Sequence, residues 1–296
     1  MTLVIIKKLL YNIFMNSGEQ IPYLGVVNAG GIGSRAPKNM APAGTKGEAL
    51  KALFSVGEPP ITLIEHHVNY HLDSGATSVV ASVGPHQKVA NYIASRYASN
   101  DRVQSFQVER ALGIGGDLLR LMRRGEIAEY AGSLVVITNV DTIADINIQD
   151  LLKSHIKNGA ELSIALSTLH GVPHEGQYLV GDNDRVVYCG ECPEGAKVNP
   201  SASVGIDGFP LWSRQGSSTG AVVANTELLI SYPWSPEDGP LSLYSDMVGQ
   251  VLSRGQVAAY DNEDRYFTDL GTNESWQRAQ EPGLLQPYLH YSSSIS

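Results

Sequence analysis

The segment Tyr23-Leu-Gly-Val-Val-Asn-Ala-Gly-Gly-Ile-Gly-Ser-Arg35 begins as an apolar run and ends in closely spaced glycines. Residues 23–29 have the length and composition of a buried strand. Glycines directly after a strand allow backbone N–H groups to approach phosphate oxygens without a clash with a side chain. The segment therefore predicts a strand that leads into an anion-binding loop, with Arg35 meeting the charge through its planar guanidinium group.

Two common phosphate-binding spacings do not fit this loop. The G-x-G-x-x-G spacing of dinucleotide-binding folds begins at Gly31 and Gly33, but Pro37 follows instead of a glycine that enters a helix. The Walker pattern is absent because Gly44-Thr-Lys46 lacks the required lead and order. Taken alone, the loop is also compatible with a flexible turn, so its function depends on the rest of the chain.

Strand-like and helix-like segments alternate beyond the loop. We expect strands at 78–84, 103–108, 134–138 and 162–169, and helices at 61–74, 87–97, 115–124 and 148–158. The pattern changes after about residue 170, where we expect strands at 178–180, 186–188, 218–225 and 256–260 and helical segments at 243–254 and 274–279.

This order predicts an α/β fold: a Rossmann-like α/β/α sandwich with a mixed, mainly parallel central sheet and a small mixed-sheet lobe. We expect one domain over residues 21–285, an N-terminal extension over residues 1–20 and a C-terminal tail over residues 286–296. The apolar start has lysines within it and no small-residue cleavage site after it, so an extension is favoured over a signal peptide.

Charge and composition exclude several classes of function. The net charge of −9 argues against a non-specific nucleic-acid binder, although a single nucleotide needs only a few local cations. The two cysteines, Cys189 and Cys192, cannot form a disulfide framework. No stretch reaches the roughly eighteen apolar residues of a membrane span. We therefore expect a cytoplasmic protein that binds neither nucleic acid nor membrane.

The segment Lys51-Ala-Leu-Phe-Ser-Val-Gly57 gives the glycine-rich loop a more specific interpretation, because its lysine could hold a second phosphate. Together the two segments resemble the sugar nucleotidyltransferases (nucleoside-diphosphate-sugar pyrophosphorylases), which read G-G-x-G-T-R and then K-P-L-x-P-V-G. The matching positions are Gly30, Gly31, Gly33, Ser34 and Arg35 in the first motif and Lys51, Leu53, Val56 and Gly57 in the second.

The resemblance extends over roughly residues 23–280. Further segments resemble the motifs E-x-x-L-G-T-A-G, N-G-D-x-x-x-D, P-x-x-Y-G, N-T-G and W-x-D-I-G-T-P of that family. In chain order they are Glu109–Gly116, Asn139-Val-Asp141 with Asp145, Pro173–Gly176, Ser218-Thr-Gly220, and Thr268–Thr272 with Trp276. Each motif alone is weak, whereas their common order and spacing make the resemblance strong.

The resemblance implies the transfer of a nucleoside monophosphate from a nucleoside triphosphate to a sugar 1-phosphate, with release of pyrophosphate. It implies catalytic roles for Arg35, Lys51 and Asp141, and it assigns Mg²⁺ to Asp141 and Asp269. The implied nucleotide contacts are Ala29, Gly30, Gly31, Gly33, Ser34, Glu109 and Gly113. The implied sugar-phosphate contacts are Gly176, Glu191 and Thr219. Relatives commonly form dimers or tetramers, so a homo-oligomer is expected.

One departure from the family lies on the acceptor side. The family motif F-x-E-K-P corresponds to Tyr188-Cys-Gly-Glu-Cys-Pro193, in which Cys192 replaces the lysine that contacts the sugar phosphate in relatives. An unusual acceptor, such as a carbocyclic sugar mimic (a cyclitol) that carries a phosphate, is compatible with this change. The nucleobase also stays open, with GTP, ATP and dTTP all possible.

Other interpretations were weighed against this one. A non-catalytic nucleotide-sugar-binding regulator would not need the residues Arg35, Lys51, Asp141 and Asp269. A GT-A glycosyltransferase would use an Asp-x-Asp motif, which Asn139-Val-Asp141 fits only in part.

For two smaller sets of residues we favour an interpretation without redox or metal-binding function. The spacing Cys189-x-x-Cys192 is that of redox motifs, but the sequence around it is not typical of them. The two cysteines could also form a zinc site together with His170 and His174, which we consider less favoured than a structural role. The histidines His66, His67 and His71 fall on one predicted helix, where a solvated face is favoured over zinc binding.

Overall fold

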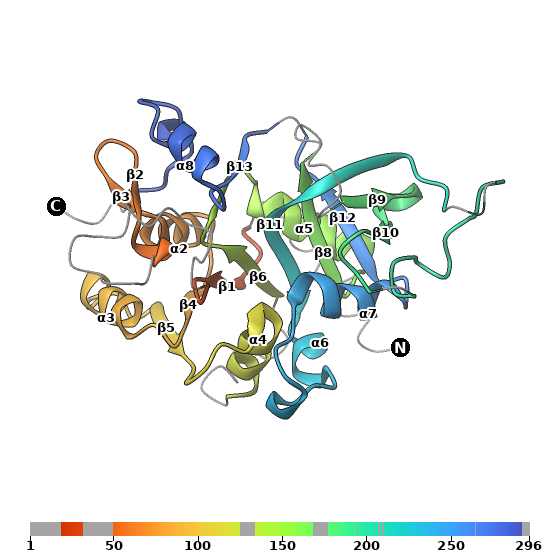
Figure 1. The fold of residues 1–296 in the computed structure, drawn as a ribbon, viewed down its shortest axis with the longest axis horizontal. Helices are drawn as coiled ribbons and strands as arrows, with labels where there is room; N and C mark the ends of the chain where they lie inside the picture. The colour runs from red at the N-terminus through yellow and green to blue at the C-terminus, as the bar shows by residue number, and fades with distance from the viewer. Residues whose placement is uncertain are drawn as a thin grey trace.

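A nine-stranded sheet forms the centre of the structure (Figure 1). This computed structural model describes residues 19–31, 50–124, 134–167, 177–193, 195–206, 208, 210–263 and 265–291. The strands of the sheet are β1 (Tyr23–Asn28), β4 (Ser78–Gly84), β5 (Val103–Gln107), β6 (Leu134–Asn139), β8 (Leu162–Ser167), β9 (Gln177–Val180), β10 (Val186–Cys189), β11 (Arg214–Asn225) and β12 (Val257–Asp261).

The sheet is mixed, as the sequence predicts. Its order is β10-β9-β11-β6-β1-β4-β5, and β8 joins β11 to β12. Strand β1 pairs in parallel with β4 and β6, β5 is parallel to β4, and β12 is parallel to β8. Strand β11 runs antiparallel to β6, β8 and β9. Asn28 and Asn139 are in register at the carboxyl ends of the parallel strands β1 and β6. Open α/β sheets bind their ligands at this edge.

Helices cover both faces of the sheet, which confirms the α/β/α sandwich. They are α2 (Leu63–Asp73), α3 (Gln87–Arg96), α4 (Gly113–Arg123), α5 (Ile148–Asn158), α6 (Thr226–Ser231), α7 (Val248–Leu252) and α8 (Asn273–Ala279). Strand β1 divides its side chains between two cores, with Tyr23 and Val27 in one and Leu24 and Val26 in the other. The first core contains buried residues of α2, α3 and α5, and the second those of α4, α6 and α7.

The second half of the chain extends the main sheet rather than forming a separate sheet. Strand β11 begins at Arg214, four residues before the expected start, and this extra stretch pairs with β9. Figure 1 shows β9 and β10 at the end of the sheet that is remote from β4 and β5. The stretch Arg-Gln-Gly-Ser has no apolar pattern, so only its pairing partner makes it a strand.

Two small antiparallel sheets were not expected from the sequence. Strand β2 (Ser55–Val56) pairs with β3 (Ile61–Thr62), and β7 (Thr142–Ala144) pairs with β13 (Phe267–Asp269). Strands of two or three residues carry too little periodicity to be recognised. The pair β7–β13 matters for function, because it brings two distant parts of the chain to the same edge of the main sheet.

Helix α2 corrects the expected solvated histidines. His66, His67 and His71 are all buried, and every residue of α2 from Leu63 to His71 is buried. Residues 286–291, which we assigned to a tail, cover part of this helix: the Asn69 amide donates to the His290 carbonyl oxygen at 3.1 Å. No helix in the described ranges is both long and apolar enough to cross a membrane.

Candidate active site

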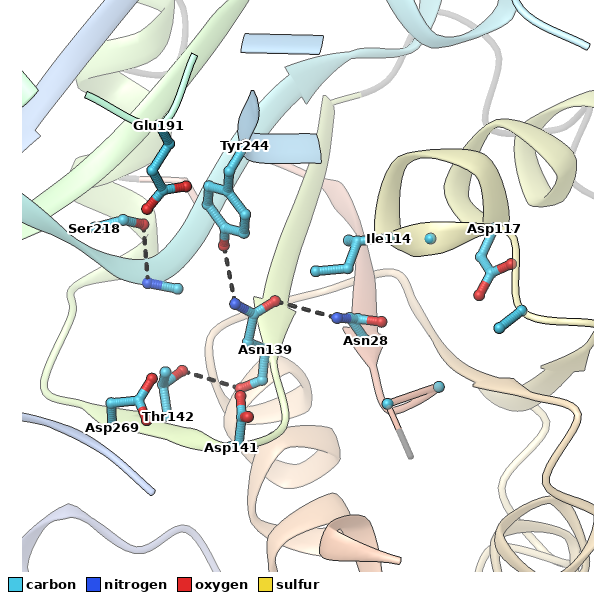
Figure 2. Close-up of a pocket in the computed structure, with 15 residues that line it drawn as sticks. Asn28, Ile114, Asp117, Asn139, Asp141, Thr142, Glu191, Ser218, Tyr244 and Asp269 are labelled. Atoms are coloured by element: carbon cyan, nitrogen blue, oxygen red, sulfur yellow. Dashed lines mark hydrogen bonds between the residues drawn. The ribbon is translucent and has the colours of Figure 1, made fainter. Parts of the chain in front are cut away.

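A cavity of about 480 Å³ opens at the carboxyl ends of β1 and β6 (Figure 2). This volume is in the range of small-molecule binding sites. The lining residues are Asn28, Gly30, Gly31, Ala111, Gly113, Ile114, Asp117, Asn139, Asp141, Thr142, Glu191, Ser218, Gly220, Tyr244 and Asp269. The cavity is thus built from the glycine-rich turn after β1, the start of α4, the β6–β7 turn and the second half of the chain.

An ion pair between Lys51 and Asp141 lies at the edge of this cavity. Lys51 opens a 3-10 turn (Lys51–Leu53) and is 7% exposed, while Asp141 lies in the turn between β6 and β7. The Lys51 ammonium group donates to Asp141 Oδ2 at 3.0 Å, across 90 positions of sequence. The fold therefore brings together the two residues to which the sequence assigns phosphate and metal binding.

Asp269 joins Asp141 through the small β7–β13 sheet. Asp269 is in register with Thr142, and the Leu270 N–H donates to the Asp141 carbonyl oxygen at 2.7 Å. Both carboxylates line the cavity, and Figure 2 shows them at the same end. Within the described part of the chain, no group of three or more His, Cys, Asp or Glu side chains is placed to hold a metal. A cation at this end would need further oxygen ligands from phosphate or water, which is how proteins usually bind Mg²⁺.

A chain of hydrogen bonds crosses the floor of the cavity. The Asn28 amide donates to Asn139 Oδ1 at 3.3 Å, and the Asn139 amide donates to the Tyr244 hydroxyl at 3.1 Å. Tyr244 comes from a π-helical turn (Leu243–Met247) that precedes α7. Burial raises the pKa of Tyr244, so its hydroxyl stays neutral and can donate to a ligand. Asn28 and Tyr244 were not predicted as site residues, and only the tertiary contacts reveal them.

The glycine-rich turn is held close to the strand beside it. A Cβ atom at Gly30 would lie 3.2 Å from the Gly84 nitrogen, so only glycine fits without a shift of the backbone. The His86 Nε2 atom lies 3.2 Å from the Gly30 carbonyl oxygen. The N–H of Ala29 donates to the Ser82 carbonyl oxygen at 2.8 Å, which places Ala29 at the base of the turn. Gly30 and Gly31 are thereby presented to the cavity.

The acceptor side is formed by Glu191 and β11. Glu191 follows β10, and Ser218 and Gly220 of β11 line the same wall. A Cβ atom at Gly220 would lie 2.6 Å from Thr142 Oγ1, so glycine permits the close approach of β11 to β7. Cys192 is 2% exposed and its thiol donates to the Tyr244 carbonyl oxygen at 3.8 Å. The position of the family's lysine is therefore occupied here by a thiol inside the protein.

The predicted site residues fall into three groups. Six of them line the cavity, namely Gly30, Gly31, Gly113, Asp141, Glu191 and Asp269, and Lys51 contacts one of these. Thr219, Glu109 and Ala29 are not among the lining residues: the Thr219 hydroxyl donates to the Ala165 carbonyl oxygen inside the sheet, Glu109 is exposed, and Ala29 is buried at the base of the glycine-rich turn. Gly33, Ser34, Arg35 and Gly176 lie outside the described residues.

Asp117 is a lining residue that the sequence did not single out. It lies in α4, is 4% exposed, and accepts a hydrogen bond from the Leu112 N–H at 3.2 Å. Burial raises the pKa of Asp117 to about 6. A carboxylate four residues beyond Gly113 has helical spacing toward the same wall as the motif glycine, and this spacing was the available signal.

Known structures with this fold were found, although sequence comparison found no relatives. No protein-family model and no curated protein matches the chain. HddC from Yersinia pseudotuberculosis superposes with a TM-score of 0.61 and 18% identity over 88% of this chain and 98% of that chain. The same protein has a structure complexed with GMP-PN.

Two other solved structures are similar. A Bacillus anthracis protein assigned as a glucose-1-phosphate thymidylyltransferase, in complex with a sucrose, has a TM-score of 0.63 at 18% identity and covers 88% of this chain and 94% of its own. The inositol-1-phosphate CTP transferase from T. maritima has a TM-score of 0.57 at 13% identity and covers 87% of this chain and 93% of its own. The fold implied by the sequence resemblance is therefore confirmed.

Proposed function

We propose that this chain is a Mg²⁺-dependent nucleotidyltransferase that joins a nucleoside monophosphate to a sugar 1-phosphate or a cyclitol phosphate. The observation that carries the proposal is the Lys51–Asp141 ion pair at 3.0 Å beside Asp269, at the edge of the cavity that Gly30 and Gly31 line. A cation and two carboxylates around a glycine-rich turn are the groups that hold and neutralise phosphates.

The reaction forms one P–O bond and breaks another. An oxygen of the acceptor phosphate attacks the α-phosphorus of the nucleoside triphosphate, the bond between that phosphorus and the bridging oxygen breaks, and pyrophosphate leaves. Both reactants are anionic, so catalysis consists mainly of positioning and charge neutralisation. Lys51 would hold an α-phosphate oxygen, and Arg35 would neutralise the leaving pyrophosphate. The backbone N–H groups of the loop beyond Gly31, around Gly33 and Ser34, would hold the triphosphate.

Asp141 and Asp269 would hold the Mg²⁺ ion. When bound, the ion would neutralise phosphate oxygens at the reacting centre. The donor set fits this role, because both ligands are hard carboxylate oxygens that line the cavity, Asp269 at the end of β13 and Asp141 directly before β7, its partner strand. Lys51 already contacts Asp141, so it would lie within reach of the same phosphate.

The acceptor would lie against Glu191, Ser218 and Tyr244. Glu191 would accept from neighbouring hydroxyl groups of a sugar or cyclitol, and the Tyr244 hydroxyl would donate to one. No lysine or arginine is among the described residues that line the cavity, so the acceptor phosphate would depend on Mg²⁺ and on Arg35. The similar fold of an inositol-1-phosphate CTP transferase supports a cyclitol phosphate as an acceptor.

The two rival functions explain less. A regulator that only binds nucleotide sugars has no use for the Lys51–Asp141 pair beside Asp269, and a GT-A glycosyltransferase would leave the glycine-rich loop unexplained. We place the enzyme in the cytoplasm, where nucleoside triphosphates are available, and propose a homodimer or homotetramer, which light scattering of the purified chain would measure.

The proposal is tested by incubating the full chain with Mg²⁺, one of the nucleoside triphosphates and a panel of hexose 1-phosphates and cyclitol phosphates. We expect pyrophosphate release with at least one pair and none when the acceptor is omitted. Absence of pyrophosphate for every pair would refute the proposed function, and turnover of hexose 1-phosphates alone would refute the cyclitol acceptor.

A further inference from the structure

Asp117 is a buried carboxylate for which the proposed reaction has no task. It reaches the cavity from α4, and Figure 2 shows it on the opposite side from Glu191 and Asp269. It is therefore separate from Asp141 and Asp269, the two carboxylates to which the proposal assigns Mg²⁺. Buried acidic groups with raised pKa values gather at functional sites, because burial in a cleft is what tunes such groups for binding or catalysis.

The two carboxylate oxygens of Asp117 have different surroundings. Oδ1 accepts a hydrogen bond from the Leu112 N–H at 3.2 Å, which fixes the side chain against the start of α4. Oδ2 makes no hydrogen bond to any described residue and lies beside the glycine-rich turn, 3.3 Å from where a Cβ atom of Gly30 would be. One oxygen therefore serves the helix, and the other lies beside the glycine-rich turn that lines the cavity.

The position of Asp117 matches the base end of a bound nucleotide. Lys51, Asp141 and Asp269 mark where the triphosphate would lie, and a nucleotide carries its base at the other end. The wall around Asp117 consists of the small residues Gly30, Gly31, Ala111 and Gly113 and the apolar side chain of Ile114. Small residues leave room for a flat ring to approach the backbone, and Ile114 offers it an apolar face.

We infer that Asp117 recognises the Watson–Crick edge of guanine, so that the nucleotide donor of the proposed reaction is GTP. This inference rests on the proposed function for the placement of the triphosphate. An ionised carboxylate only accepts hydrogen bonds. Guanine presents two adjacent donors, N1–H and the 2-amino group, to such an acceptor.

The other bases match a carboxylate less well. Adenine and cytosine pair their amino group with an acceptor nitrogen, and thymine and uracil place one N–H between two carbonyl oxygens. Each of these sets an acceptor against an acceptor in the site. A site built for a hydrogen-bond pattern rejects ligands that leave buried groups unpaired, so the selectivity for guanine is expected to be large.

The inference is tested by calorimetric binding to the full chain with Mg²⁺ and without acceptor. We expect GTP to bind at least about tenfold more tightly than ITP, which lacks the 2-amino group. The difference in affinity between GTP and ATP, CTP or dTTP is expected to be larger than that between GTP and ITP. Equal affinity for GTP and ITP in the wild-type chain, tighter binding of another base, or no nucleotide binding at all would overturn the inference.

Asp117→Asn provides a sharper test. The amide oxygen is expected to keep the hydrogen bond from the Leu112 N–H, so the amide nitrogen takes the position of Oδ2 and donates into the cavity, which suits the 2-oxo group of xanthine and opposes the 2-amino group of guanine. We expect the variant to prefer XTP over GTP, the reverse of the wild type. The exposed Asp101→Asn variant serves as the matched control and should keep the wild-type preference.

Equal loss of affinity for every nucleotide in Asp117→Asn would assign a structural role to Asp117 and overturn the inference. Failure of the proposed function can be distinguished from failure of this inference. GTP binding without pyrophosphate release for any acceptor would refute the nucleotidyltransferase activity but leave the contact between Asp117 and guanine standing. Pyrophosphate release that is most efficient with ATP or dTTP would support the nucleotidyltransferase activity and refute guanine recognition by Asp117.

Discussion

Lys51 and Asp141 carry the proposed chemistry at the scale of single residues. Their ion pair is largely shielded from water on the lysine side, with 8% side-chain exposure for Lys51 and 30% for Asp141. A charge-assisted hydrogen bond from the same ammonium group to a bound phosphate would be worth about 1.5–3 kcal/mol. The pair is therefore interpreted as a prepared phosphate site.

Replacing Lys51 by alanine is expected to lower kcat/KM by about 10- to 150-fold, the factor that corresponds to about 1.5–3 kcal/mol. Steady-state pyrophosphate release measures this. Lys153→Ala is the matched control, since Lys153 forms an exposed ion pair with Asp150 at 3.2 Å outside the cavity. Turnover of Lys51→Ala within a few fold of wild type would show that the assigned role is wrong.

Asp269→Asn is expected to raise the Mg²⁺ concentration needed for half-maximal activity by on the order of tenfold, because a neutral amide replaces one of two carboxylate ligands. A Mg²⁺ titration at saturating nucleotide measures the shift. The exposed Asp101→Asn variant should not move the midpoint. An unchanged midpoint in Asp269→Asn would remove Asp269 from the metal site.

Site residues could be predicted from the sequence where they belong to a motif. They could not be predicted where only a tertiary contact brings them to the cavity. Asp141, Asp269 and Glu191 were found from sequence order, and all three line the cavity. The Thr219 hydroxyl points into the sheet instead, because neighbouring side chains of a strand alternate between its faces and the Ser218 side chain takes the cavity side. Tyr244 is more than one hundred residues from Asn139, its hydrogen-bond partner, and no local pattern links them.

Helix α2 shows the same contrast at the scale of elements. Its capping box is readable in sequence: Thr62 accepts from the Glu65 N–H, and the Glu65 side chain accepts from the Thr62 N–H. Its three histidines suggest a solvent-exposed face. All three are buried, because α8 and residues 286–291 pack into the same hydrophobic core as α2. Local composition cannot reveal which distant segment covers a helix.

Buried neutral histidines predict a loss of stability in acid. Burial lowers the pKa of His67 to about 4 and that of His71 to about 3, and it lowers the pKa of His66 well below its usual 6.5. The unfolded chain takes up these protons below pH 6.5 while the folded chain does not, so the free energy of unfolding falls as pH drops from about 6.5 to 4. Asp117, with its raised pKa, opposes this by one proton below pH 6.

The net slope expected between pH 6 and pH 4 is about 3 kcal/mol per pH unit. Urea unfolding at several pH values measures it. His67 is buried and leucine is an apolar side chain of similar size, so His67→Leu should fold and should reduce the slope by about 1.4 kcal/mol per pH unit. The same slope in wild type and variant would mean that His67 does not titrate on unfolding.

The order of strands and helices was largely predictable, since most of the expected segments coincide with an element of the structure. The exceptions have physical reasons. The polar start of β11 is a strand only because β9 pairs with it. The expected helix over 243–254 is interrupted, with a π-helical turn from Leu243 to Met247 before α7, and this turn directs Tyr244 into the cavity.

The whole molecule concentrates negative charge where its substrates must bind. Asp117, Asp141, Glu191 and Asp269 all line the cavity of a chain with a net charge of −9. An anionic donor and an anionic acceptor enter such a site only with added positive charge, which the proposal assigns to Mg²⁺, Lys51 and Arg35. The fold places Lys51 and these four carboxylates at the carboxyl edge of the sheet, between the half that presents the glycine-rich turn and the half that presents Glu191.

The central claim is that this chain transfers a nucleoside monophosphate, and the fate of the α-phosphorus tests it most directly. The full chain is incubated with Mg²⁺, a phosphorylated sugar or cyclitol, and a nucleoside triphosphate labelled with ³²P at the α position. The account predicts that the label moves into a diphosphate-linked product that resists phosphatase, while unlabelled pyrophosphate is released. Label that stays in the triphosphate, or that appears only as free nucleoside monophosphate, for every donor and acceptor would contradict it.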